Sequence, residues 1–311
     1  MPRHRIIFIG TPAFAVPSLK ALIDDLRFEV VGVVTQPDMP AGRSLELTPP
    51  PVKITAKNYG LTVMQPPKIS HILEQLTDLK PAAIVVVAYA QIIPESVLAI
   101  PAFGCVNVHA SLLPRYRGAS VIQAPIMNGD TTSGVTVMVM DKTLDTGPLL
   151  GQAEYRLRPD ETSATLAESL SRLGAQALPD ILYGYLEGRI KPQTQDNALA
   201  NYVGRLEKKD GIIDWQQPAD AIERFARAMY PWPSAWTWLT GKQLKVLEID
   251  PAIIEINTYK PGKTFLYNSN LAVQCGQNSL LIRRLQLEGK KAMTSEEFLR
   301  GYKDSVGKVL G

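Results

Sequence analysis

Two side chains in the segment CVNVHAS, residues 105–111, have the types and spacing that acyl-transfer chemistry needs. The segment is predicted to be a strand, and alternate side chains of a strand share a face, so Asn107 and His109 lie on one side about 7 Å apart. Both can donate a hydrogen bond to an oxygen atom, and His109 can also carry a proton. A tetrahedral intermediate of acyl transfer needs such donors around its oxyanion. The pattern leaves open a second interpretation, in which His109 is a core residue with its hydrogen bonds met inside the protein.

A carboxylate is the third group that this chemistry calls for. The apolar segment GVTVMVM, residues 134–140, runs into the turn-forming stretch DKTLDTGP, which contains Asp141 and Asp145. A carboxylate beside His109 fixes the tautomer of the ring and favours its charged form. The two aspartates are therefore the candidates for a partner of His109.

Cys105 raises the alternative of a cysteine nucleophile that works with His109. Strand geometry separates these two residues by about 13 Å, whereas a thiolate and an imidazole must lie within hydrogen-bond reach. Cys105 is therefore interpreted as a small core residue. The other cysteine, Cys275, is remote and no C-x-x-C motif occurs, so neither a disulfide framework nor a zinc site is predicted and a reducing cytoplasm fits.

The elements that must position these groups alternate along the first half of the chain. Nearly continuous Val/Ile runs predict strands buried on both faces, separated by helical periodicity, which is the pattern of a largely parallel sheet covered by helices. Predicted strands cover 5–10, 29–35, 61–65 and 82–89, and predicted helices cover 16–26, 51–60 and 69–79. The glycine pattern GTPAFA after the first strand is not G-x-G-x-x-G, which disfavours dinucleotide binding.

The second half predicts a different architecture. A clear helix covers 165–188, the polar, aperiodic stretch 189–204 is interpreted as a linker, and short alternating strands with Gly and Asn turns follow. The expected fold class is thus α/β, with a Rossmann-like domain at 1–188 and a smaller OB-like β-barrel domain at 205–311. The stretch QPDMPAGRSLELTPPP, residues 36–51, is expected to be a long loop without regular structure, and such loops are usually functional or disordered.

Charge and hydropathy limit the classes of partner. Residues 205–311 hold 16 lysines and arginines against 12 acidic residues, whereas the rest of the chain holds 17 against 18. The basic excess of the second domain suits either an RNA-binding face or an ordinary solvated surface. The longest apolar run, AAIVVVAYA, is far shorter than the roughly 20 residues of a membrane span, and no signal peptide is recognised at the N-terminus. A cytoplasmic protein is expected.

The motif N-x-H-x-S-L-L-P-x-x-x-G at 107–118, followed by D-x-x-x-D-T-G at 141–147, resembles the 10-formyltetrahydrofolate-dependent formyltransferases. The resemblance implies formyl transfer without a metal, with Asn107, His109 and Asp145 as the catalytic residues. It also places the donor, 10-formyltetrahydrofolate, against two short segments. These segments are Ser111, Leu112, Leu113 and Pro114, and Val87, Ala88, Tyr89 and Ala90.

Flanking motifs narrow the resemblance to the branch whose acceptor is initiator methionyl-tRNA, used in translation initiation. They are GTPAFAVPSL at 10–19, TQPDMPAGR at 35–43, IDW at 213–215 and YPWPSAW at 230–236. The alternative is a nucleotide-sugar N-formyltransferase with the same folate donor. A relative acting on glycinamide ribonucleotide is disfavoured by the extra basic domain, and a non-catalytic RNA-binding protein by the intact catalytic motif.

The RNA-binding candidates are basic residues of the loop and of the second domain, and a monomer is expected. They are Arg43, Arg283, Arg284, Lys290 and Lys291. Within the loop, Leu45 and Glu46 stand where family members often have lysines, so the loop has less positive charge to offer RNA.

Overall fold

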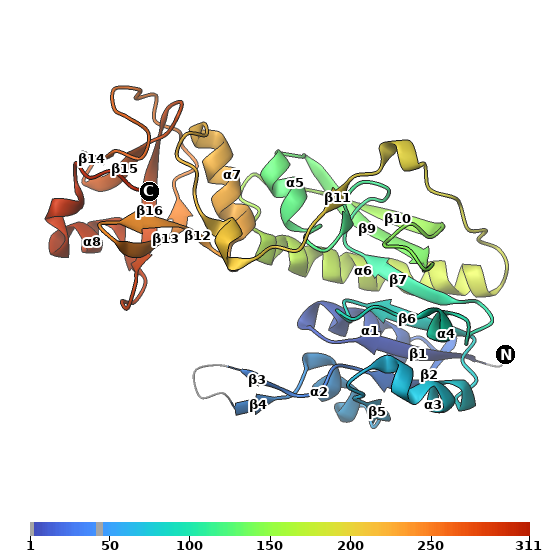
Figure 1. Cartoon of the computed structure of the whole chain (residues 1–311). Coiled ribbons are helices and arrows are strands. Elements are labelled where there is room, and N and C mark those ends of the chain that lie inside the picture. The colour runs from blue at the N-terminus through green and yellow to red at the C-terminus, as the bar shows by residue number, and fades with distance from the viewer. Residues whose placement is uncertain (1–2, 42–45) are drawn as a thin grey trace. The chain divides into compact units, whose positions relative to one another are not determined.

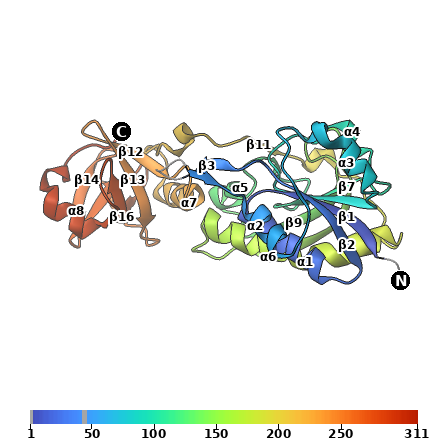
Figure 2. The same ribbon diagram turned by 90° about the horizontal axis from the view of Figure 1, so that it is seen from below.

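The computed structural model describes residues 3–41 and 46–311, and it divides into two compact units (Figures 1 and 2). The first unit comprises Met1–Val121, Thr132–Arg156 and Ala167–Val203, and the second comprises Ile122–Thr131, Leu157–Leu166 and Gly204–Gly311. Among the described residues, no helix is long and apolar enough to cross a membrane.

A seven-stranded sheet with the order β10-β9-β7-β6-β1-β2-β5 organises the first unit. Strands β7, β6, β1, β2 and β5 are parallel, while β9 and β10 run antiparallel at one edge. The bounds are β1 His4–Gly10, β2 Phe28–Val34, β5 Val63–Met64, β6 Ala83–Val87, β7 Cys105–His109, β9 Thr132–Val139 and β10 Leu149–Arg156. The Rossmann-like, largely parallel sheet expected from the Val/Ile runs is confirmed.

Helices cover both faces of this sheet, which explains why its strands are apolar on both sides. On one face, Val106 and Val108 pack into a core with residues of α1, α2 and α6; on the other, Cys105 packs with residues of α3 and α4. The predicted alternation of side chains along β7 is thereby confirmed. The helices are α1 Val16–Asp24, α2 Pro51–Asn58, α3 Leu73–Asp78, α4 Glu95–Leu98 and α6 Ser163–Leu186.

Two stretches expected to lack regular structure contain short strands. In the loop 36–51, β3 (Met39–Ala41) pairs antiparallel with β4 (Glu46–Thr48). In the stretch 189–204, β11 (Tyr202–Val203) pairs with β8 (Arg117–Gly118) of the first unit. The expectation was wrong at these points because such short pairs are stabilised by backbone hydrogen bonds to a partner strand and need no apolar periodicity. Arg43 lies outside the described residues.

The second unit has an antiparallel sheet with the order β12-β13-β16-β15-β14, and β17 pairs with β16. The strands are β12 Ala235–Leu239, β13 Lys242–Ile249, β14 Thr264–Tyr267, β15 Asn270–Gln274, β16 Ser279–Leu287 and β17 Met293–Thr294. The helices are α5 Gln123–Asn128, α7 Ala219–Met229 and α8 Ser295–Gly301. The expected smaller β domain is confirmed, and α5, which comes from the first half of the sequence, packs against its α7.

Candidate active site

His109 ends β7 at the carboxyl edge of the parallel strands, where α/β sheets bind ligands. The ring is buried, at 6% exposure, and its Nε2 lies 2.9 Å from the carbonyl oxygen of Tyr116. A carbonyl only accepts hydrogen bonds, so Nε2 carries a hydrogen in this arrangement. The other nitrogen, Nδ1, lies 3.7 Å from Oδ1 of Asp145. At this distance the two side chains form an ion pair whenever the ring is protonated.

Of the two candidate aspartates, the structure brings Asp145 to His109. Its second carboxylate oxygen, Oδ2, accepts a hydrogen bond of 2.8 Å from the backbone N–H of Gly118. Asp141 instead accepts from the backbone N–H of Thr143 at 3.0 Å and from the hydroxyl of Thr146 at 2.8 Å. Asp145 also has a φ of 55°, a left-handed conformation that costs a residue with a Cβ energy unless its surroundings hold it.

Asn107 is the polar group of this site that remains available to a ligand. It is half-buried on β7, in register with Met138 of β9, and its side-chain amide makes no hydrogen bond within the described residues. The amide, two residues before His109 on the same strand, is free to bind an oxygen atom of a substrate.

The predicted donor turn Ser111–Pro114 is held by its own polar groups. The Ser111 hydroxyl donates to the carbonyl of Arg115 at 2.8 Å, the Leu113 N–H donates to Oγ1 of Thr136 at 3.1 Å, and the Leu113 carbonyl accepts from the Gln152 amide at 2.8 Å. Leu112 and Pro114 stay half-exposed. The turn thus presents apolar surface on a backbone held by hydrogen bonds, and its role in binding the donor stays a prediction.

The second predicted donor segment, Val87–Ala90, continues from the end of β6, the strand next to β7. Ala88 and Ala90 are exposed with positive φ angles of 48° and 62°, whereas Tyr89 is buried between them. The Tyr89 carbonyl accepts from the Gln36 amide at 2.7 Å, and its buried hydroxyl has no hydrogen-bond partner within the described residues. Burial raises the pKa of this phenol. Side chains no larger than methyl at the exposed positions leave the backbone accessible to a ligand.

Cys105 behaves as the core residue that was predicted. The thiol is fully buried, and burial raises its pKa to about 12. Because the thiolate is the nucleophilic form, a thiol with this pKa is inert near neutral pH.

Sequence reasoning missed the groups that hold this site from a distance. Thr136 and Gln152 form hydrogen bonds with the donor turn. Gln195 donates to the carbonyl of Asp145, and Arg117 donates to Gln195. They come from four separate segments, and no local motif marks Thr136, Gln152 or Gln195. Only the position of Arg117 within the central motif was a signal.

The predicted RNA-binding residues of the second unit lie on β16 and in the turn after it, and all four are exposed. Arg283 forms an ion pair with Asp250. The other three, Arg284, Lys290 and Lys291, form no ion pair within the part of the chain that the structure describes. Their role in binding RNA stays a prediction.

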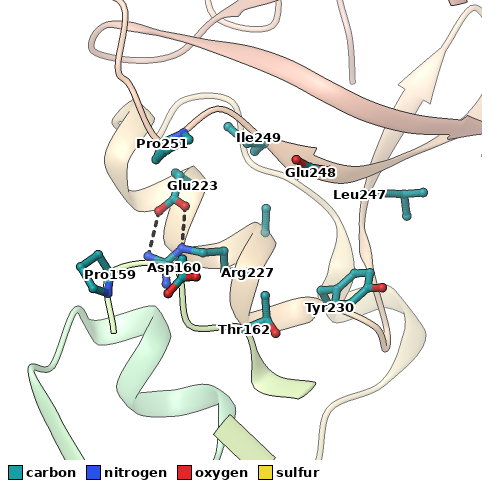
Figure 3. Close-up of a pocket in the computed structure, with 11 residues that line it drawn as sticks. Pro159, Asp160, Thr162, Glu223, Arg227, Tyr230, Leu247, Glu248, Ile249 and Pro251 are labelled. Atoms are coloured by element: carbon teal, nitrogen blue, oxygen red, sulfur yellow. Dashed lines mark hydrogen bonds and ion pairs between the residues drawn. The ribbon is translucent and has the colours of Figure 1, made fainter. Parts of the chain in front are cut away.

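A cavity of about 360 Å³ lies in the second unit (Figure 3). Its lining is mostly apolar and includes Tyr230, the first residue of the YPWPSAW motif. Its charged groups are largely satisfied: Glu223 and Arg227 form a two-pronged ion pair at 2.5 and 2.9 Å, and Arg227 also donates to the carbonyl of Glu161 at 2.8 Å. None of the predicted catalytic residues lines this cavity.

The fold and the site together define a formyl transferase: residues 4–182 match the formyl transferase family and residues 205–303 match the formyl transferase C-terminal domain, so the chain belongs to this family. Within it, the chain is similar over almost its whole length to proteins named methionyl-tRNA formyltransferase. That of Geotalea daltonii is 46% identical over 99% of this chain and 98% of its own length. That of Citrifermentans bemidjiense is 44% identical over 100% of this chain and 98% of its own length.

Solved structures share the fold at much lower identity. An N-formyltransferase from Helicobacter canadensis, in complex with folinic acid and dTDP-3-aminofucose, gives a TM-score of 0.70 at 17% identity, over 90% of this chain and 98% of that chain. Glycinamide ribonucleotide transformylase 1 from Symbiobacterium toebii gives 0.52 at 19% identity, over 62% and 95%. At these identities the likeness concerns the fold alone.

Proposed function

We propose that this protein transfers the formyl group of 10-formyltetrahydrofolate to the α-amino group of methionine on initiator methionyl-tRNA, for translation initiation. The identity of 44–46% to proteins named for this reaction extends through both units, which supports the acceptor. The catalytic part of the proposal rests on one observation: buried His109, paired with half-buried Asp145, lies on the same strand as Asn107, whose amide makes no hydrogen bond within the described residues.

Asn107 and His109 act on the charge that develops on the formyl oxygen. An α-amino group titrates near 8, so a useful neutral fraction attacks at pH 7 without a strong base. Asn107 donates a hydrogen bond to the developing oxyanion, and the positive charge of the His109 ring stabilises it from the neighbouring position. This role needs neither a covalent enzyme intermediate nor a metal, in keeping with the buried, inert thiol of Cys105.

Asp145 stabilises the charge on His109 and helps to receive the proton that the attacking amine loses. The carboxylate has one oxygen on the Gly118 N–H and the other on the His109 side. A proton taken from the amine is passed on to the folate nitrogen, which leaves as its bond to the formyl carbon breaks. The exposed backbone of Ala88 and Ala90 and the turn Ser111–Pro114 hold the folate at this edge. The excess of basic residues in 205–311 binds the RNA part of the acceptor. A monomer in the cytoplasm completes the proposal.

Three acceptors distinguish the proposed reaction from its relatives. The protein is incubated with 10-formyltetrahydrofolate and offered, in separate reactions, charged initiator tRNA, a nucleotide aminosugar and glycinamide ribonucleotide. Formylation of the charged tRNA at the highest kcat/KM is expected. Preferred formylation of either small acceptor refutes the assignment of the acceptor, and no turnover with any of them refutes the enzymatic function.

A further inference from the structure

Arg117 is a buried cation that has no anionic partner among the residues that the structure describes. Its side chain is 2% exposed, and the hydrogen bonds of its guanidinium all go to neutral groups. Nε and Nη2 donate to Oε1 of Gln195 at 3.2 and 2.8 Å, Nη2 also donates to Oδ1 of Asn197 at 2.8 Å, and Nη1 donates to the hydroxyl of Tyr202 at 2.9 Å. At this burial the guanidinium is not a contact for substrate.

Such an arrangement is costly for stability. Burying a charge without an opposite charge costs several kcal/mol even after relaxation. A carboxylate in the place of Gln195 would lower that cost by pairing with the guanidinium, yet the chain has an amide there. The amide must therefore provide something that a carboxylate cannot, namely hydrogen-bond donors.

The amide nitrogen of Gln195 uses both of its donors on the loop that carries Asp145. Nε2 donates to the carbonyl of Asp145 at 2.9 Å and to the carbonyl of Gly147 at 2.7 Å. Since the guanidinium has only donors, Arg117 dictates that the oxygen of this amide faces it and that the nitrogen faces the loop. The orientation of Gln195 is thus set by the buried cation.

Asp145 is consequently held at two points. The Gly118 N–H, next in sequence to Arg117, binds its carboxylate, and Gln195 binds its carbonyl. These contacts maintain a left-handed φ of 55° and leave Oδ1 toward His109. We propose that Gln195, oriented by the buried guanidinium of Arg117, is a positioning residue that holds Asp145 against His109. The inference rests on the catalytic role proposed above for Asp145.

Two substitutions of Gln195 distinguish two roles for this residue. In one it positions Asp145, and in the other it only accepts hydrogen bonds from the buried guanidinium of Arg117. Gln195→Glu keeps an acceptor for Arg117 and pairs it with a charge, but offers no donor to the Asp145 and Gly147 carbonyls. Gln195→Met, of similar size, removes both functions. If Gln195 only accommodates Arg117, the Glu variant behaves like the parent and the Met variant is merely less stable. If it positions Asp145, both variants lose turnover, and we expect kcat to fall at least about tenfold with KM for the donor unchanged.

A matched control exists in the second unit. Gln274 is 1% exposed, and its amide nitrogen likewise donates to backbone carbonyls, those of Ile256, Cys275 and Asn278. Gln274→Met therefore reports what the loss of a buried amide does to stability alone. We expect it to lower Tm and to leave kcat unchanged.

The chain has only three histidines, so ¹⁵N-imidazole NMR observes His109 directly and without substrate. The His109 ring signals are expected to move in both Gln195 variants and to stay in place in Gln274→Met. This readout separates the two proposals, because it reports the position of Asp145 even if no formyl transfer is found. Unchanged His109 signals with kcat within about threefold of the parent in Gln195→Glu overturn the positioning role.

Discussion

Arg117 of the first unit and the arginines of β16 in the second unit are held in opposite ways. In the first, Arg117 is 2% exposed and bound to neutral groups; in the second, Arg283 and Arg284 are exposed on β16, and Arg283 has Asp250 as an ion-pair partner. A buried guanidinium is bound by hydrogen bonds of fixed direction, whereas an exposed one contributes mainly through its charge. Catalysis in the first unit should therefore depend on the exact placement of its polar side chains. RNA binding by the second unit should depend mainly on the total positive charge of its exposed residues.

The largest effect expected from this contrast is that of His109→Ala. Removing the ring takes away the positive charge beside the developing oxyanion and the partner of Asp145, so turnover should fall by about 10²–10³ while the fold and donor binding are retained. The measurement is single-turnover formylation together with equilibrium binding of a folate. His71→Ala is the matched control, because His71 is exposed on a remote helical turn. Turnover by His109→Ala within about threefold of the parent would remove His109 from the mechanism.

Asp145→Asn keeps the size and shape of the side chain but removes its negative charge and places a donor where Asp145 has an acceptor. The amide oxygen can still accept from Gly118, but the –NH₂ group now faces a ring N–H of His109. A rate loss of about 10²-fold is expected, the scale of a misplaced reacting group, with KM for both substrates little changed. A variant that loses only affinity for the donor would show that Asp145 serves binding and not the reaction.

The second unit should respond to the number of charges and to salt. Replacing Arg284, Lys290 and Lys291 together by Gln should raise KM for charged tRNA several-fold and leave KM for folate unchanged. The KM for tRNA should also depend less on salt, because each lost phosphate contact lowers the slope of log affinity against log salt by about one. Arg283→Gln alone should have a smaller effect than Arg284→Gln, since Arg283 is already paired with Asp250. The full-length chain is the right protein for this test, because truncation would remove α7 from α5 within the unit. Equal salt slopes for parent and triple variant would refute an RNA-binding role of these residues.

The smallest effect on activity is expected at Cys105, which shares a strand face with Asn107 and His109 but lies at the other end of β7, packed in the core with residues of α3 and α4. Cys105→Ala should leave kcat unchanged and cost about 1 kcal/mol of stability, the scale of a small loss of buried volume. Burial raises the pKa of this thiol from 9.0 to about 12. The unfolded chain therefore ionises first, and the stability that this thiol contributes declines as pH rises from about 9 toward 12. Thermal melts at pH 8 and pH 10 should show a smaller difference between parent and Cys105→Ala at the higher pH. Inactivation of the native protein by iodoacetamide at Cys105 would contradict this account.

Much of this molecule follows from local patterns in the sequence. The Val/Ile runs place β1, β2 and β6 because a strand covered on both faces must be apolar at nearly every position. The alternation of Val106 and Val108 with Asn107 and His109 separates the core from the site, since the side-chain period of a strand is two. The set of catalytic candidates, Asn107, His109 and Asp145, came from the resemblance of the central motif to the formyltransferases.

Only the tertiary structure decided which groups meet. It brings Asp145 and not Asp141 to His109, and it places Gln195, from a stretch that looked like a linker, behind Asp145. It also joins α5 of the first half of the sequence to α7 of the second unit. These contacts link residues far apart along the chain through directional hydrogen bonds and shared burial. Such contacts cannot be read from local sequence patterns, because each one joins a group in one segment to its partner in another.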